Sequence, residues 1–92
     1  MTVYGGPGHN TVNNQWEAAN FLWYQMLAEK EFLIVSIDNR GTQERGVEFK
    51  KCTYKQLGKL ETIDQIEAAK YLGSLTYVNK NRIGIQGWSF GG

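Results

Sequence analysis

The last eleven residues, RIGIQGWSFGG, restrict the possible fold more than any other stretch of this 92-residue chain. Residues 82–86, RIGIQ, are rich in β-forming residues and lead directly into the pattern Gly87-x-Ser89-x-Gly91. Glycines two residues before and after a serine permit a turn too tight for side chains, with the serine in a strained backbone conformation. The sequence therefore predicts a strand that ends in a sharp turn and exposes Ser89 at the carboxyl edge of a sheet.

Strand and helix patterns alternate along the rest of the chain. Residues 2–4 form a short β-rich run, and residues 32–37, FLIVSI, form a nearly continuous apolar run typical of a parallel strand covered on both faces. Together with residues 82–86 they make about three predicted strands, separated by two helical patterns. This order indicates an α/β fold with three layers and a mostly parallel sheet, because right-handed crossovers place helices on the faces of such a sheet.

The two predicted helices have recognisable ends. Asn14 and Glu17 form a capping-box pattern before the first helix, whose apolar periodicity ends near Lys30. The second helical pattern covers residues 60–72, with acidic residues in its N-terminal half, and Gly73 is expected to end it. The polar, glycine-punctuated stretch between the second strand and this helix predicts a long surface connection.

A serine nucleophile requires hydrogen-bond donors for the oxyanion that forms when it attacks a carbonyl. The backbone N–H of Phe90, the residue after Ser89, is one candidate donor. The glycine-rich loop over residues 4–8 follows the first predicted strand, and the hydroxyl of Tyr4 is a second candidate. The motif and its context thus indicate part of an α/β-hydrolase fold. Simpler alternatives are a helix-capping role for Ser89 and a strand-end aromatic at Tyr4.

The segments VYGGPG, SIDNRG, DQIEAAKYLG and RIGIQGWSFGG, with the spacing between them, resemble the catalytic domain of the prolyl oligopeptidase family, most closely its dipeptidyl peptidase IV branch. The resemblance implies that Ser89 is the nucleophile and that Tyr4 and the Phe90 N–H form the oxyanion hole. Trp88 is typical of this branch, which usually has tyrosine in place of Phe90, a residue that lines the substrate pocket. The resemblance further implies release of N-terminal Xaa-Pro or Xaa-Ala dipeptides through an acyl-enzyme, with no metal or cofactor.

In α/β-hydrolases the triad acid and histidine follow the serine along the chain, but only three residues follow Ser89 here. His9, the one histidine, precedes Ser89 and is expected to be a surface loop residue. Asp38 and Asp64 also precede it: the first is expected to pair with Arg40 in a turn, and the second to be a structural carboxylate. We therefore expect the chain to be inactive by itself.

The resemblance places the chain within a longer protein, which we call the parent protein. Residues 1–92 are expected to be the N-terminal part of its catalytic domain, with a β-propeller upstream and the triad Asp and His downstream. Its expected partner is a peptide substrate, and the resemblance also allows a homodimeric parent. A periplasmic or extracellular location is expected by analogy with bacterial relatives.

Composition argues against several other classes. The net charge of +1, without a run of Lys or Arg, offers no surface for nucleic acid, and no stretch reaches the roughly 18 apolar residues of a membrane span. Cys52, the single cysteine, indicates a partly buried free thiol rather than a disulfide or zinc site. The loop sequence GGPG lacks the Lys-Ser/Thr continuation of a phosphate-binding loop.

Two alternatives for the parent protein stay open at this level. An esterase or lipase of the same fold would share Ser89, although such enzymes normally carry an H-G-G-G-type loop where this chain has Tyr-Gly-Gly-Pro-Gly. A non-catalytic α/β binding or interaction module is the other alternative, and it would leave Ser89 unreactive.

Overall fold

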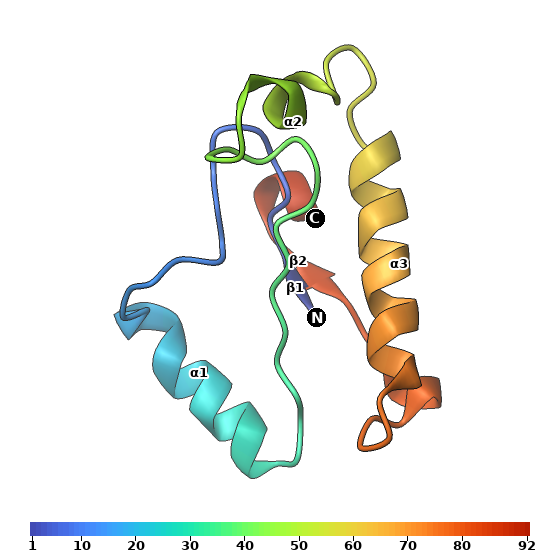
Figure 1. The fold of residues 1–92 in the computed structure, drawn as a ribbon. Coiled ribbons are helices and arrows are strands. Elements are labelled where there is room, and N and C mark those ends of the chain that lie inside the picture. Colours follow the sequence, from blue (N-terminus) through green and yellow to red (C-terminus); the bar gives the residue numbers. More distant parts are fainter.

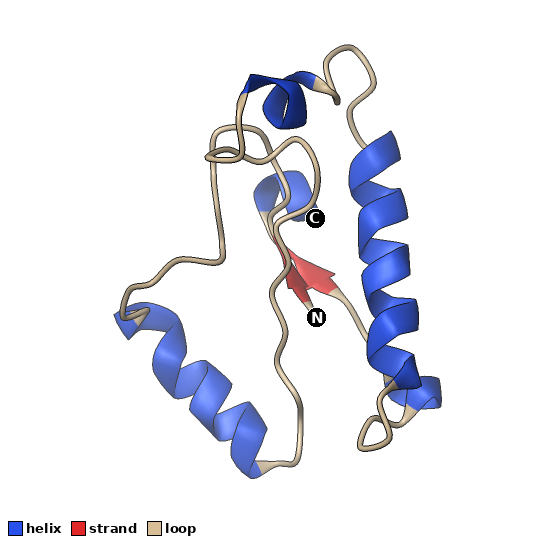
Figure 2. Ribbon diagram, viewed as in Figure 1, coloured by secondary structure: helices blue, strands red, loops and turns tan.

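The structure, a computed structural model, describes all residues from 1 to 92. Strands and helices follow one another in an α/β arrangement that is drawn by element type in Figure 2. The elements are β1 (Thr2–Val3), α1 (Ala18–Glu29), α2 (Val47–Lys51), α3 (Lys59–Ser74), the 3₁₀ turn η1 (Lys80–Arg82), β2 (Gln86–Gly87) and the 3₁₀ turn η2 (Ser89–Gly91). The predicted α/β class is confirmed.

The small sheet is parallel, with β1 at its centre. On one side β1 pairs with β2, with Thr2 opposite Gln86 and Val3 opposite Gly87. On the other side Thr2 forms a single parallel bridge with Ser36, and the two hydroxyls are hydrogen-bonded at 2.6 Å. The segment that comes second in the chain therefore lies outside β1, and the last one lies on the opposite side. A parallel sheet that grows from the first strand in both directions requires the crossover connections that the sequence predicts.

Two of the predicted strands are much shorter than expected. Residues 32–37 contribute only the bridge at Ser36, and in the run over residues 82–86 only Gln86 belongs to β2. An extended segment becomes a strand only where a neighbour pairs with its backbone, and each of these segments has a partner on one side at most. Apolar content predicts where a strand can form, but pairing decides how much of it does.

The first helix starts later than the capping-box pattern predicts. Glu17 occupies the N-cap position, makes no capping hydrogen bond through its side chain, and is followed by the first helical residue, Ala18. The predicted cap at Asn14 is therefore wrong, because the carbonyl that accepts the first helical N–H groups is that of Glu17. The predicted end near Lys30 is confirmed, since α1 ends at Glu29.

The second predicted helix corresponds to α3, which continues through Gly73 to Ser74. Gly73 is therefore not the helix stop. A Cβ atom at this position would lie 3.3 Å from the Cβ of Lys80 and 3.4 Å from the Cδ1 of Ile83, so Gly73 allows α3 to approach η1 closely. The five-residue helix α2 lies within the stretch predicted to be a surface connection, and it is too short to show a helical period in the sequence.

The helices α1 and α3 lie on opposite sides of the sheet, so three layers are present (Figure 1). Most apolar side chains in this arrangement are exposed or half-buried. Leu72, with 9% of its surface exposed, is the one buried hydrophobic residue. Trp88, at the end of β2, is 85% exposed. The arrangement of an α/β sandwich is thus formed around very little buried apolar surface. No helix has the length and apolar character needed to cross a membrane.

We expect the isolated chain to lack a cooperative thermal transition and to self-associate. Hydrophobic burial contributes about 25 cal/mol per Å² of apolar surface, and a chain with one buried apolar side chain gains too little from it to offset the entropy of folding. Calorimetry and sedimentation velocity on residues 1–92 would measure both properties. A single sharp calorimetric peak from a monomeric species would contradict this expectation.

Candidate active site

Ser89 is the first residue of η2, separated from the end of β2 by Trp88 alone, and it is exposed. Its φ angle is +57°, in the left-handed region that costs a non-glycine residue about 1–2 kcal/mol. The hydroxyl of Ser89 makes no hydrogen bond within the chain. The other non-glycine residues with positive φ lie in exposed turns and are Glu31, Glu44 and Lys55. The strained, exposed turn predicted from the glycine spacing is therefore present.

The two flanking glycines are sterically required by this turn. A Cβ atom at Gly87 would overlap the carbonyl group of Gly91, across the turn. A Cβ atom at Gly91 would overlap the carbonyl oxygen of Val3 and lie 3.1 Å from the Cα of Tyr4. The two ends of the turn around Ser89 are thus in contact with each other. The turn also packs against the end of β1, next to the loop that carries Tyr4.

Tyr4, Gly6 and Phe90 are in direct contact. A Cβ atom at Gly6 would lie 2.9 Å from both the Phe90 Cγ and the Tyr4 Cε1, and the centroids of the two rings are 6.4 Å apart. The Tyr4 hydroxyl has no hydrogen-bond partner in the chain and is free to donate to another group. Phe90 is the second residue of η2, where backbone N–H groups have no partner within the turn. The structure thus places Tyr4 and Phe90, the two residues predicted to stabilise an oxyanion, next to each other.

Asn39 holds the loop after β1 through hydrogen bonds, although the sequence analysis assigns this residue no role. Asn39 is buried, and its Nδ2 donates hydrogen bonds to the carbonyls of Gly5 (3.0 Å) and Arg40 (2.7 Å). Gln65 of α3 in turn donates to the Asn39 Oδ1 and to the Ile37 carbonyl, both at 3.1 Å. This chain of bonds links α3 to the Tyr4 loop. The only signal in the sequence is the position of Asn39 within the SIDNRG segment.

Asp38 does not form the predicted turn with Arg40. Its carboxylate accepts hydrogen bonds from the backbone N–H groups of Thr11 (2.7 Å) and Val12 (3.0 Å). These two residues lie 27 and 26 positions away along the chain, so no local pattern could reveal the pairing. Asp38 therefore fixes the segment that follows the glycine-rich loop, while Asn39 fixes the loop itself at Gly5.

Arg40 pairs with Asp64 of α3 through both its backbone and its side chain. The Nη2 of Arg40 lies 2.6 Å from the Asp64 Oδ1, its Nε lies 3.0 Å from both carboxylate oxygens, and its backbone N–H donates at 2.8 Å. Hydrogen bonds from the Arg40 side chain lower the pKa of Asp64 below its ordinary value of 3.8, against the opposing effect of burial. The same bond raises the pKa of Arg40. The expectation of a structural carboxylate at Asp64 is confirmed.

We expect the stabilising effect of this pair to disappear in acid. The pKa of Asp64 is lower in the folded than in the unfolded protein, so the unfolded state binds the additional proton. The contribution is therefore present in full above the unfolded pKa of about 3.8 and is lost as the pH falls through the lower, folded pKa. Melting temperatures of the parent protein and its Asp64→Asn variant, measured against pH, should differ at neutral pH and converge in acid.

Glu67→Gln provides the control for this prediction, because the Glu67–Lys70 pair is exposed and such pairs add little stability. Its melting temperature should follow that of the unsubstituted parent at every pH. A constant difference between the parent and Asp64→Asn from neutral to strongly acidic pH would contradict the role of the ion pair.

His9 directly follows the glycine-rich loop and is exposed, as expected of a surface loop residue. Its ring packs edge-on against Tyr4, with the ring centroids 4.7 Å apart, and it makes no hydrogen bond to Ser89. The candidate nucleophile therefore has no general base within these 92 residues. An unassisted serine hydroxyl is a weak nucleophile at neutral pH.

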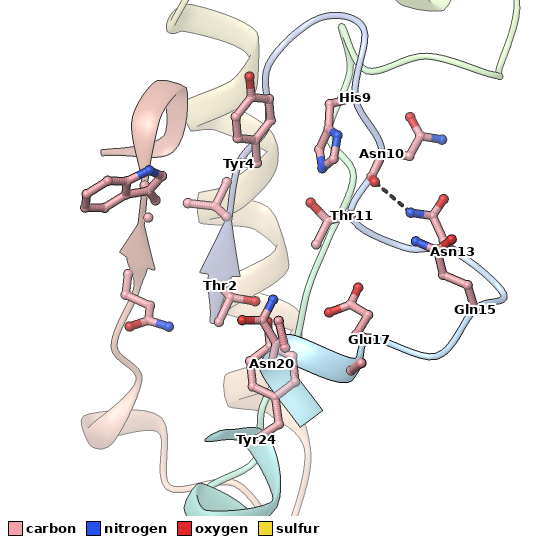
Figure 3. Close-up of a pocket in the computed structure, with 16 residues that line it drawn as sticks. Thr2, Tyr4, His9, Asn10, Thr11, Asn13, Gln15, Glu17, Asn20 and Tyr24 are labelled. Carbon is pink, nitrogen blue, oxygen red and sulfur yellow. Dashed lines mark hydrogen bonds between the residues drawn. The ribbon is translucent and has the colours of Figure 1, made fainter. Parts of the chain in front are cut away.

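Two cavities of about 500 Å³ flank the turn, and Ser89 lines neither of them. Figure 3 shows the first, which extends from Tyr4 and His9 at one end to Asn20 and Tyr24 of α1 at the other. The Tyr4 hydroxyl is at the end of the ring remote from α1 (Figure 3). This cavity therefore lies on the α1 side of the sheet, whereas the Tyr4 hydroxyl that is expected to act as donor is at the other end of the ring. The second cavity lies on the α3 side, and it is lined by Phe90 and the last two glycines.

No group of three or more His, Cys, Asp or Glu side chains is placed to hold a metal ion. Cys52 is a half-buried free thiol, as predicted, and its Sγ donates to the Phe49 carbonyl at 3.0 Å.

Comparison with known proteins agrees with this geometry. Residues 6–92 match the sequence model of the prolyl oligopeptidase family. A protein of Emericella nidulans named "Probable dipeptidyl peptidase 4" is 46% identical over the whole chain, and human dipeptidyl peptidase 8 is 37% identical. The crystal structure of Porphyromonas gingivalis dipeptidyl peptidase 4 superimposes on 99% of the chain with a TM-score of 0.93 and 46% identity.

The chain spans only a small part of these proteins. It covers 12% of the Emericella nidulans protein, 10% of human dipeptidyl peptidase 8 and 12% of the Porphyromonas gingivalis structure. In each of these relatives, the segment that matches this chain is therefore a small part of a much longer polypeptide.

Proposed function

The chain belongs to the prolyl oligopeptidase family, and on this premise we propose that its parent protein is a serine peptidase that releases dipeptides from peptide N-termini. The observation that carries the proposal is the turn at Ser89, where a serine with a left-handed φ angle follows β2 and the turn packs against the residue Tyr4, whose hydroxyl has no partner in the chain. The similarity to proteins named dipeptidyl peptidases supports the substrate class.

In the proposed mechanism, Ser89 attacks the carbonyl carbon of the second residue of a peptide with a free N-terminus. A histidine downstream in the parent takes the serine proton, and the carbonyl electrons move to the oxygen. The Tyr4 hydroxyl and the Phe90 N–H donate hydrogen bonds to that oxyanion. Collapse of the tetrahedral intermediate transfers the proton to the departing amine. Water then attacks the acyl-enzyme with the same residues and releases the dipeptide.

The roles of the neighbouring residues follow from their contacts. Gly87 and Gly91 allow the turn to close, and Gly91 also allows it to pack on the end of β1. The proposed role of Phe90 is to form, with its exposed ring beside Gly6, an apolar wall for the substrate side chain next to the attacked carbonyl. Asn39 and Asp38 hold the loop that carries Tyr4.

We propose the same domain arrangement for the parent that the resemblance implies. Residues 1–92 form the N-terminal part of the catalytic domain, a β-propeller precedes them, and the triad acid and histidine follow. The length of the relatives and the lack of a base near Ser89 support this arrangement. Residues 1–92 by themselves are not expected to turn over substrate.

The test is to assay the intact parent with Gly-Pro-p-nitroanilide and with a fluorophosphonate probe, which reacts with activated serines. The parent should release Gly-Pro and should carry the probe on Ser89, whereas residues 1–92 alone should do neither. Hydrolysis of short esters without cleavage of the anilide would favour an esterase instead. A parent that leaves the probe unreacted would contradict the nucleophile assignment and favour a binding module.

A further inference from the structure

The side chain of Tyr4 has no polar anchor within the chain. Its hydroxyl makes no hydrogen bond, so only contacts of its ring restrict the side chain. A hydrogen bond weakens steeply when its angle is poor, and a donor that turns between rotamers is in place for only part of the time. The groups that restrict the Tyr4 ring therefore decide how well its hydroxyl can serve as a donor.

Two aromatic rings and one glycine lie against the Tyr4 ring. The centroid of the Phe90 ring is 6.4 Å away, and a Cβ atom at Gly6 would lie 2.9 Å from the Tyr4 Cε1. The His9 ring is nearer, with its centroid 4.7 Å from that of Tyr4 and the two planes 67° apart (Figure 3). This edge-on geometry is favourable for an aromatic pair, because the positive edge of one ring meets the negative face of the other.

The backbone next to His9 is tied to a distant part of the chain. The Oδ1 of Asn10 accepts a hydrogen bond from the backbone N–H of Gln43 at 3.1 Å. The backbone N–H of Thr11 donates to the Oδ1 of Asp38 at 2.7 Å. The two residues that follow His9 are therefore held in place, and with them the position from which its ring reaches Tyr4.

The contact with Tyr4 is also the one specific interaction of the His9 side chain. His9 is exposed and makes neither a hydrogen bond nor an ion pair. Both rings line the first cavity, whose volume is about 500 Å³. On this side of the molecule the Tyr4 ring thus has open space into which it can turn, and His9 is the ring that packs against it there.

We propose that His9 is a positioning residue, whose edge-on contact keeps the Tyr4 ring from turning into the first cavity and so holds its hydroxyl ready for the oxyanion. This role rests on the proposed function, in which Tyr4 is an oxyanion donor. His9 acts through packing alone, without taking the proton of Ser89 or touching the substrate. Another aromatic ring at position 9 should therefore replace it.

The first test compares His9→Ala with His9→Phe in the intact parent, with Gly-Pro-p-nitroanilide as substrate. His9→Ala should lower kcat about 3- to 10-fold with KM nearly unchanged, because an aromatic pair favours one rotamer by about that factor and the donor acts in the transition state. His9→Phe keeps a ring beside Tyr4 and should recover most of the loss. Val12→Ala, which shortens an exposed side chain of the same segment, should match the parent.

Three outcomes would overturn the positioning role. An unchanged kcat in His9→Ala would show that the contact does not matter for the reaction. A rise in KM at constant kcat would place His9 in substrate binding instead. Equal losses in His9→Phe and His9→Ala, with both variants folded by their melting temperatures, would show that the imidazole nitrogens act rather than the packing.

Combining His9→Ala with Tyr4→Phe tests whether His9 acts through the Tyr4 hydroxyl. The double variant should be no slower than Tyr4→Phe alone, because the group that His9 positions is already absent. Losses that multiply would show that His9 acts by another route, and they would overturn the proposal.

A measurement without substrate tests the contact itself. Replacement of Tyr4 by 3-fluorotyrosine in the intact parent provides a fluorine NMR signal that depends on the surroundings of the ring. His9→Ala should move this signal toward its position in the denatured protein, and Val12→Ala should leave it in place. An unmoved signal in His9→Ala would overturn the contact. If the parent does not cleave the anilide at all, the proposed function fails, while the fluorine signal still decides whether His9 holds the Tyr4 ring.

Discussion

Replacement of Ser89 by alanine in the parent protein should lower kcat for Gly-Pro-p-nitroanilide by a factor on the order of 10⁴ or more. The variant loses the oxygen that attacks the carbonyl, and nothing else near the turn can replace it: the chain offers no other hydroxyl on a left-handed residue at a strand end. Since Ser89 makes no hydrogen bonds within the chain, its removal should leave the fold unchanged. Steady-state kinetics and covalent labelling by a fluorophosphonate would measure both effects.

Ser74→Ala serves as the matched control for this variant. Ser74 ends α3, is exposed, and bonds only to the Tyr71 carbonyl of its own helix. It should retain the activity and the labelling of the unsubstituted parent. If Ser89→Ala kept more than a few per cent of the activity while the control behaved normally, the nucleophile would have to be sought elsewhere in the parent.

Tyr4→Phe should lower kcat by about 10²- to 10³-fold with little change in KM, because an oxyanion donor acts mainly in the transition state. The substitution removes only the hydroxyl, which has no partner in the chain. The ring would keep its contacts with Gly6, Phe90 and His9, so the loop should stay in place. Kinetics with the anilide substrate, with the melting temperature as a check on folding, would test this expectation.

The control for Tyr4→Phe is Tyr77→Phe, which removes a hydroxyl from an exposed tyrosine between α3 and η1. Its kinetics should match those of the parent. A loss of less than about threefold in Tyr4→Phe would show that the hydroxyl does not stabilise the oxyanion, and the second donor would then be a different group.

Local patterns predicted much of the secondary structure. The apolar periodicity of α1 and α3 is visible in the sequence, and the end of α1 near Lys30 was predicted correctly. The start of α1 was not, because the polar pattern at Asn14 fits a cap equally well and the choice of Glu17 depends on where the preceding loop leads. Strand lengths were overestimated for a related reason: whether residues 32–37 pair depends on a neighbour that local sequence does not specify.

The partners of polar side chains were predicted least well. Asp38 and Arg40 are two residues apart and of opposite charge, which favours a local pair, yet each binds a different segment. Arg40 reaches Asp64, 24 residues away, and Asn39 reaches Gly5, 34 residues away. Such pairs depend on which segments the fold brings together, and a single sequence does not record that information.

The sequence by itself determined the turn at Ser89, because its strain is local: Gly87 and Gly91 permit a backbone path that side chains would block. Which residues pack beside this turn was decided only by the tertiary structure. Packing of Gly91 on the end of β1 brings the Tyr4 loop beside it, and Gln65 of α3 holds that loop through Asn39. Steric conflicts within five residues are readable from the sequence, whereas contacts between distant segments exist only once the chain has folded.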